Sequence, residues 1–200
     1  MSSRRYSIAG WLSIIVAVLF PMAFFIGIIH DIIAKAKFQY HGPNFGPGDI
    51  LFIVFTCISV YVISVFRYLL NDRYNTHELD MLINISIVWL ILFQVSSLCL
   101  KGIFMALWPI SKESMTIIYL CYMAIAMVTI GIVDILIAIK LLKIDTAQNS
   151  LIKAYAYINL VAGVLEASVF LSPLAIILVP VSNVILGMIF LREKEGVEFV

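Results

Sequence analysis

The sequence predicts an all-α integral membrane protein, a polytopic bundle of about six transmembrane helices that forms a single domain over residues 1–200. The chain is 63% hydrophobic and only 12% charged, and its mean hydropathy is +1.09. These values lie far outside the usage of soluble domains. Several apolar runs approach or exceed the ~20 residues that cross a bilayer, and the connections between them are too short to hold a separate soluble domain.

The first two predicted spans cover residues 8–29 and 50–70, and a glycine- and proline-rich segment separates them. The first run is too long for the hydrophobic region of a signal peptide, so we interpret it as a transmembrane helix. The separating segment, residues 38–49, reads FQYHGPNFGPGD and must contain a loop. Its His41 and Asn44 are candidate contacts for a ligand or partner outside the cell. The alternative is a plain connector.

The other four spans are predicted over residues 81–108, 115–139, 151–171 and 174–191. In the third span, polar residues recur at steps of three and four and form one stripe that ends at Lys101. The last two spans are separated at Ser172-Pro173, because a residue before proline is disfavoured in a helix. A single helix over both would be ~60 Å long, about twice the hydrocarbon thickness, so a hairpin is expected.

The distribution of lysine and arginine predicts the orientation. With six spans, both termini and the even-numbered connections share one side. That side holds nine of the 13 basic residues, namely Arg4, Arg5, Arg67, Arg73, Lys140, Lys143, Lys153, Arg192 and Lys194. Lys35, Lys37, Lys101 and Lys112 fall on the other side. The positive-inside rule therefore places both termini in the cytoplasm of a cell whose inner or plasma membrane holds the protein.

Seven polar or charged residues inside the spans are the candidate site residues: Arg67, Gln94, Lys101, Asp134, Asn159, Glu166 and Asn183. A carboxylate in a membrane helix must face protein or a water-filled cavity. Asn159, Gly163 and Glu166 stand at i, i+4 and i+7 and share one helix face. We therefore expect that face to point into the bundle.

Depth estimates at ~1.5 Å per residue suggest partners for these residues. Lys101 matches Glu166 in the outer half, and Arg67 matches Asp134 in the inner half. Near the midplane, Gln94 would face an amide on the fifth span. Pairing removes the cost of an isolated charge in the bilayer. The alternative for Lys101 is to extend its side chain to the outer surface.

No motif in the sequence indicates catalysis. The chain contains no Gly-x-Ser-x-Gly, no His-Glu-x-x-His and no cysteine–histidine arrangement. Cys57, Cys99 and Cys121 lie in apolar runs, so we expect small buried side chains and neither a disulfide nor a metal site. We expect no enzyme activity, no cofactor and, at a net charge of +1, no direct binding of nucleic acid.

Two classes of function remain. The first is a non-catalytic membrane subunit, an anchor or sensor that forms a homo-oligomer or a larger assembly and holds a soluble partner at its basic cytoplasmic face. The alternative is a small-solute, proton or ion transporter or channel component that uses the midplane amides and buried acids. The first class is favoured, because amides and small residues also join membrane helices. The spans also contain little of the glycine that unwound, moving helices use.

Overall fold

The computed structural model describes residues 2–36, 45–106, 112–144 and 150–195. They form six helices: α1 (Ser2–Ala36), α2 (Pro47–Tyr74), α3 (Asp80–Ala106), α4 (Lys112–Lys143), α5 (Ser150–Ala167) and α6 (Ser172–Glu195). All of them except α5 are long and apolar enough to cross a membrane. The all-α prediction is confirmed, and the five apolar helices support a membrane location.

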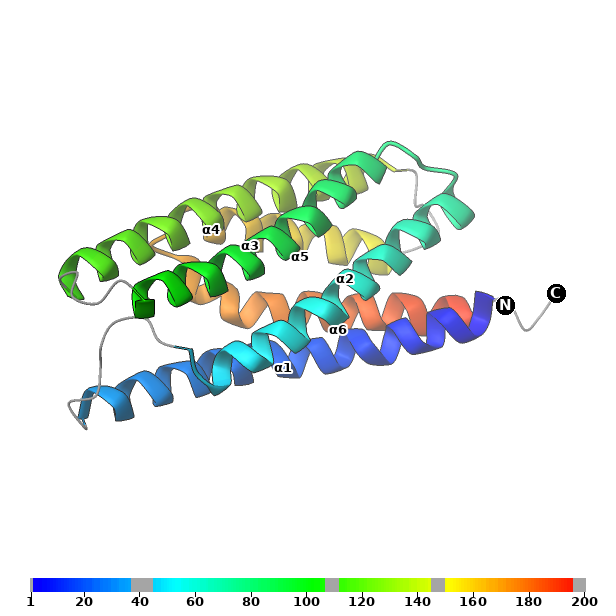
Figure 1. The fold of residues 1–200 in the computed structure, drawn as a ribbon. Helices are drawn as coiled ribbons and strands as arrows, with labels where there is room; N and C mark the ends of the chain where they lie inside the picture. The colour runs from blue at the N-terminus through cyan, green and yellow to red at the C-terminus, as the bar shows by residue number, and fades with distance from the viewer. Residues whose placement is uncertain (1, 37–44, 107–111, 145–149, 196–200) are drawn as a thin grey trace.

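The helices run alongside one another in one elongated bundle (Figure 1), and their contacts follow chain order and close into a ring. Each helix contacts the next one, and α1 and α6 lie side by side and close the ring. The pairs α1/α6, α4/α5 and α1/α2 pack most extensively, whereas α3 packs least against its two neighbours. The fold therefore combines closely packed helix pairs with one more loosely held helix.

Glycines set the distance between two of the closely packed pairs. A Cβ atom added to Gly131 on α4 would lie 2.5 Å from the carbonyl oxygen of Gly163 on α5. One added to Gly187 on α6 would lie 2.9 Å from the carbonyl oxygen of Gly10 on α1. Small residues at such crossings let two backbones approach closely, which favours helix association in lipid. Few glycines are present, but these four lie at the crossings where a side chain would not fit.

Large apolar side chains fill the end of the bundle where α1 begins and α6 ends, which we call the terminal end. All six helices contribute to this core, which includes Tyr6, Phe66, Leu69, Leu70, Leu79, Ile83, Ile137, Leu141, Ile152, Leu186, Ile189 and Phe190. The Phe66 ring lies 5.3 Å from the Tyr155 ring in an edge-to-face contact. Many of the residues buried farther from this end are small, including Ser13, Ala17, Ala23, Ser59, Ala126, Ala162, Ala175 and Ser182. The terminal end is therefore the part of the bundle with a conventional packed core.

The structure corrects the boundary between the last two predicted spans. The expected break was at Ser172-Pro173, but α5 already ends at Ala167 and the chain turns through residues 168–171. Val169 has a left-handed φ of 57°, which a helix cannot continue. Ser172 and Pro173 begin α6, because proline is well tolerated in the first turn of a helix.

The structure also corrects the environment of the three cysteines. Cys57, Cys99 and Cys121 are free thiols exposed on the outside of the bundle, so the prediction that they are buried is wrong. Apolar residues on membrane helices face lipid as readily as protein, because lipid chains are as apolar as the core. Residue type alone therefore does not distinguish the two faces.

Candidate functional site

Two acids from neighbouring helices lie together where α4 packs against α5. Asp134 stands one turn beyond Gly131 on α4, and Glu166 stands one turn beyond Gly163 on α5. Because the two glycines meet, the two acidic side chains are brought close enough for their charges to interact. The same Gly-x-x-acid spacing on two helices thus builds the pair.

No basic side chain in the described part of the chain balances this pair. The ion pairs of the described residues include neither acid. The Oε2 atom of Glu166 is buried and finds no hydrogen-bond partner among the described residues. Two like charges repel strongly away from water, and charged residues within membrane helices usually pair. Two carboxylates this close together cannot both stay charged away from water unless a cation joins them, so the site can hold a proton or a cation.

Hydroxyl and amide groups of α5 and α6 form a cluster that comes within electrostatic range of Asp134 through Tyr155. Ser182 donates a hydrogen bond of 2.6 Å to the side-chain oxygen of Asn159. The Tyr155 hydroxyl reaches both of these side chains and lies within electrostatic range of Asp134. Sequence analysis identified Asn159, but it missed Tyr155 and Ser182 as members of the cluster.

Asn183 is not part of this cluster. Its side-chain amide donates to the Val179 carbonyl at 2.9 Å within α6. Its own backbone carbonyl accepts a 2.7 Å hydrogen bond from Ser13 on α1. Asn183 therefore belongs to the α1/α6 contact.

Lys101 pairs with Asp49, and the predicted pairing of Lys101 with Glu166 is wrong. The Lys101 Nζ atom lies 2.6 Å from Asp49 Oδ1, and the two side chains are only 12% and 13% exposed. Lys101 also lies 5.7 Å from the centroid of the Tyr119 ring. The second Asp49 oxygen accepts the Gly46 N–H at the start of α2. One buried ion pair thus joins α2 and α3 and stabilises the beginning of α2.

Arg67 also has other partners than the predicted Asp134. Its guanidinium donates to the side-chain oxygen of Asn84, and it lies 3.9 Å from Asp80 at the start of α3. The sequence-based depth estimates match Arg67 with Asp134, but in the structure Arg67 contacts Asn84 and Asp80. Depth along the membrane does not predict a contact by itself, because the two helices must also be adjacent and the two side chains must face each other.

Gln94 lies opposite Thr56 of α2, at 3.5 Å between the two side-chain oxygens. The expected contact of Gln94 with Asn159 is therefore wrong, since α3 and α5 are not adjacent in the ring. The polar stripe on α3 faces α2 at Gln94 and Lys101. It serves as a line of contacts between helices.

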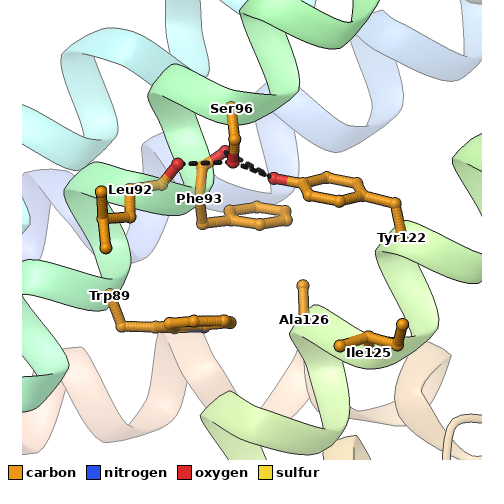
Figure 2. Close-up of a pocket in the computed structure, with 7 residues that line it drawn as sticks. All are labelled: Trp89, Leu92, Phe93, Ser96, Tyr122, Ile125 and Ala126. Carbon is orange, nitrogen blue, oxygen red and sulfur yellow. Dashed lines mark hydrogen bonds between the residues drawn. The ribbon is translucent and has the colours of Figure 1, made fainter.

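A separate apolar hollow of about 100 Å³ lies between α3 and α4 (Figure 2). It is lined by Trp89, Leu92, Phe93, Ser96, Tyr122, Ile125 and Ala126. The Phe93 and Tyr122 rings stack with centroids 5.6 Å apart. The Tyr122 hydroxyl lies 2.6 Å from Ser96 Oγ and donates to the Phe93 carbonyl at 2.8 Å. Because these hydroxyls are already bonded, the hollow mainly offers apolar surface.

Charged and polar contacts tie the helices together around the terminal end. The contacts include Arg5 above the Tyr68 ring, Tyr6 with Asp72, Arg73 with Glu193, Asn71 with Asp80, and Lys140 with Glu78. They link α2 to α1, α3 and α6, and they link α4 to the segment between α2 and α3. Together with the exposed basic side chains at this end, these contacts form a charged rim around the packed core. They hold the helix ends in position relative to one another.

The candidate loop residues His41 and Asn44 lie outside the described residues, so their interpretation stays a prediction. Within the described ranges, no three His, Cys, Asp or Glu side chains are grouped so that they could hold a metal ion. No protein-family model, curated protein or solved structure matches the chain. The functional interpretation therefore depends on the two polar regions, the acid pair and the charged rim.

Proposed function

We propose that the chain is a non-catalytic integral membrane subunit, an anchor or sensor that acts in an oligomeric or multi-component assembly. In this proposal six helices enter the membrane, both termini are cytoplasmic, and a soluble partner docks at the terminal end. Because α5 starts and α6 finishes at that end, the hairpin returns the chain to the side from which it entered. The basic residues around the same end favour the cytoplasm.

The charged rim on a packed core is the observation that carries the proposal. The apolar core draws on all six helices, and ion pairs and hydrogen bonds join neighbouring helices around it. A surface held in this way loses little conformational freedom when a partner binds. The exposed basic side chains Arg5, Lys143, Lys153 and Arg192 suit an acidic surface on the partner.

Charge reversal at the rim should weaken retention of the partner. Because complementary charges steer and orient binding, the double variant Lys153→Glu, Arg192→Glu should retain about tenfold less partner, equivalent to ~1.4 kcal/mol. The measurement is the amount of partner that co-purifies in mild detergent, quantified by native mass spectrometry. Lys153→Arg with Arg192→Lys is the matched control and should retain the partner. Only monomer in the wild-type sample, or equal retention by both variants, would argue against docking here.

A second candidate function is transport of a proton, ion or small solute. The specific observation in its favour is the acid pair, Asp134 and Glu166, which has no base among the described residues. Transport sites in membrane proteins commonly use such buried carboxylates. Amides and prolines within the spans are also frequent in transporters, although they equally serve as helix contacts.

Neutral variants of the acid pair separate the two candidates. Asp134→Asn with Glu166→Gln should leave the protein folded, because it removes like-charge repulsion at nearly constant volume. If the chain transports ions, flux into reconstituted vesicles should fall at least about tenfold, whereas the exposed-site control Glu78→Gln should retain it. Absence of flux in the wild type, or full flux in the double variant, would leave the pair without a transport role.

A further inference from the structure

The turn between α5 and α6 has an apolar, outward-facing surface. Residues 168–171 read Ser-Val-Phe-Leu, and the Phe170 side chain is 94% exposed. Leu171 beside it and Leu174 in the first turn of α6 are exposed as well. A turn with these side chains is unfavourable in water, because it leaves a contiguous apolar patch without cover.

The backbone of this turn satisfies its own hydrogen-bond donors. Each backbone N–H from Ser168 to Ser172 has an acceptor. Those of Ser168, Val169, Phe170 and Ser172 donate to the carbonyls of Val164, Glu166, Ser168 and Val169, respectively. The Leu171 N–H donates to the Ser168 hydroxyl. The Ser172 hydroxyl also donates to the Val169 carbonyl at 2.6 Å. Unsatisfied backbone groups are what exclude irregular structure from hydrocarbon. This turn avoids that cost for its donors without help from water.

The turn between α2 and α3, at the terminal end of the bundle, provides a comparison within the same chain. Residues 75–79, between α2 and α3, read Asn-Thr-His-Glu-Leu. The side chains of His77 and Glu78 are 70% and 82% exposed. This connection is polar and exposed, as expected in water. The α5/α6 turn is also exposed, but its large exposed side chains are apolar.

The length of α5 places the α5/α6 turn below the far surface of the bilayer. Lys153 is the exposed charged residue of the first turn of α5 and marks the interface. From Lys153 to Ala167, where α5 ends, the helix rises by ~21 Å, which is less than the ~30 Å of hydrocarbon. Any tilt of the helix shortens this reach further.

We infer that the α5/α6 turn lies inside the outer part of the hydrocarbon layer, where Phe170 and Leu171 contact lipid acyl chains. The hairpin then enters from the terminal end and returns without reaching the water on the other side. Glu166, one helical turn before Phe170, is consequently held at membrane depth. The inference does not depend on docking at the terminal end, since it concerns the opposite part of the bundle.

A spin label on the turn tests the inference. Phe170→Cys is made in a chain whose Cys57, Cys99 and Cys121 are replaced by serine, labelled with a nitroxide and reconstituted in phosphatidylcholine vesicles. Collisions with oxygen, which concentrates in hydrocarbon, are compared with collisions with a water-soluble nickel chelate. The oxygen-to-nickel ratio should be several-fold higher than for the same label at Glu78→Cys.

Two results would overturn the inference. Nickel accessibility as high as at the Glu78→Cys control would place the turn in water. Protection from both reagents would show that protein, such as a second copy of the chain, covers it. As a check without a label, Phe170→Asp should lower the folded yield well below that of Phe170→Ala, because a charge is disfavoured in hydrocarbon. Equal yields of these two variants would also contradict the inference.

Discussion

Replacing Gly131 with leucine should destabilise the bundle by ~3 kcal/mol or more, because α4 and α5 would have to separate. The first added carbon would already lie 2.5 Å from the Gly163 carbonyl oxygen and 2.6 Å from the Ala167 nitrogen. These are backbone atoms of the facing helix, so no side-chain rotation can relieve the clash. The measurement is thermal unfolding in detergent, where ~3 kcal/mol corresponds to a fall of roughly 6–12 °C for a chain of this size.

Gly102→Ala is the matched control for this prediction. A Cβ added to Gly102 on α3 meets nothing within 4 Å. Alanine also favours the helix by up to ~1 kcal/mol relative to glycine, so the melting temperature should stay constant or rise slightly. If Gly131→Leu were as harmless as Gly102→Ala, α4 and α5 would not cross closely at this glycine. The close crossing that places Asp134 beside Glu166 would then be wrong as well.

Removing Asp49 should have an effect of similar size through a different mechanism. Asp49→Ala leaves the Lys101 ammonium buried without its 2.6 Å partner, and breaking one side of such a pair costs ~3–5 kcal/mol. The variant also loses the acceptor for the Gly46 N–H at the beginning of α2. Because α3 packs least against its neighbours, this ion pair is expected to contribute strongly to holding it. The expected result is a large fall in melting temperature or in folded yield.

The exposed pair of Lys140 and Glu78 provides the comparison. Its charged atoms are 3.9 Å apart and Glu78 is 82% exposed, so Glu78→Gln should cost no more than ~1 kcal/mol. Exchanging the buried charges, with Asp49→Lys and Lys101→Asp together, should recover part of the loss that Asp49→Ala causes. A loss for Asp49→Ala no larger than for Glu78→Gln would mean that the buried pair does not hold α3.

The helices could be predicted from the sequence because each apolar run is long and bounded by polar, glycine or proline residues. The contacts between the helices could not be predicted from the sequence. Depth along the membrane suggested a similar level for Lys101 and Glu166, but it gave no information on which helices are adjacent or which faces meet. In the ring, α3 contacts α2 and α4, so Lys101 reaches Asp49 and never α5.

Two signals in the sequence could have improved the prediction of the sites. Pro47 and Asp49 stand in the first turn of α2, where proline fits and an acid interacts favourably with the helix dipole. We assigned them to the loop before the helix and therefore overlooked Asp49 as a partner. The repeated Gly-x-x-acid spacing on α4 and α5 marks two similar helix faces, although only the structure shows that they meet.

The orientation of the terminal end decides whether a cytoplasmic partner can reach the charged rim. Glu78→Cys, in a chain with its three native cysteines replaced by serine, places one thiol on the exposed turn between α2 and α3. A membrane-impermeant maleimide should leave this thiol unmodified in intact cells and modify it once the cells are permeabilised. Full modification in intact cells would place the terminal end outside the cytoplasm and contradict the proposed docking.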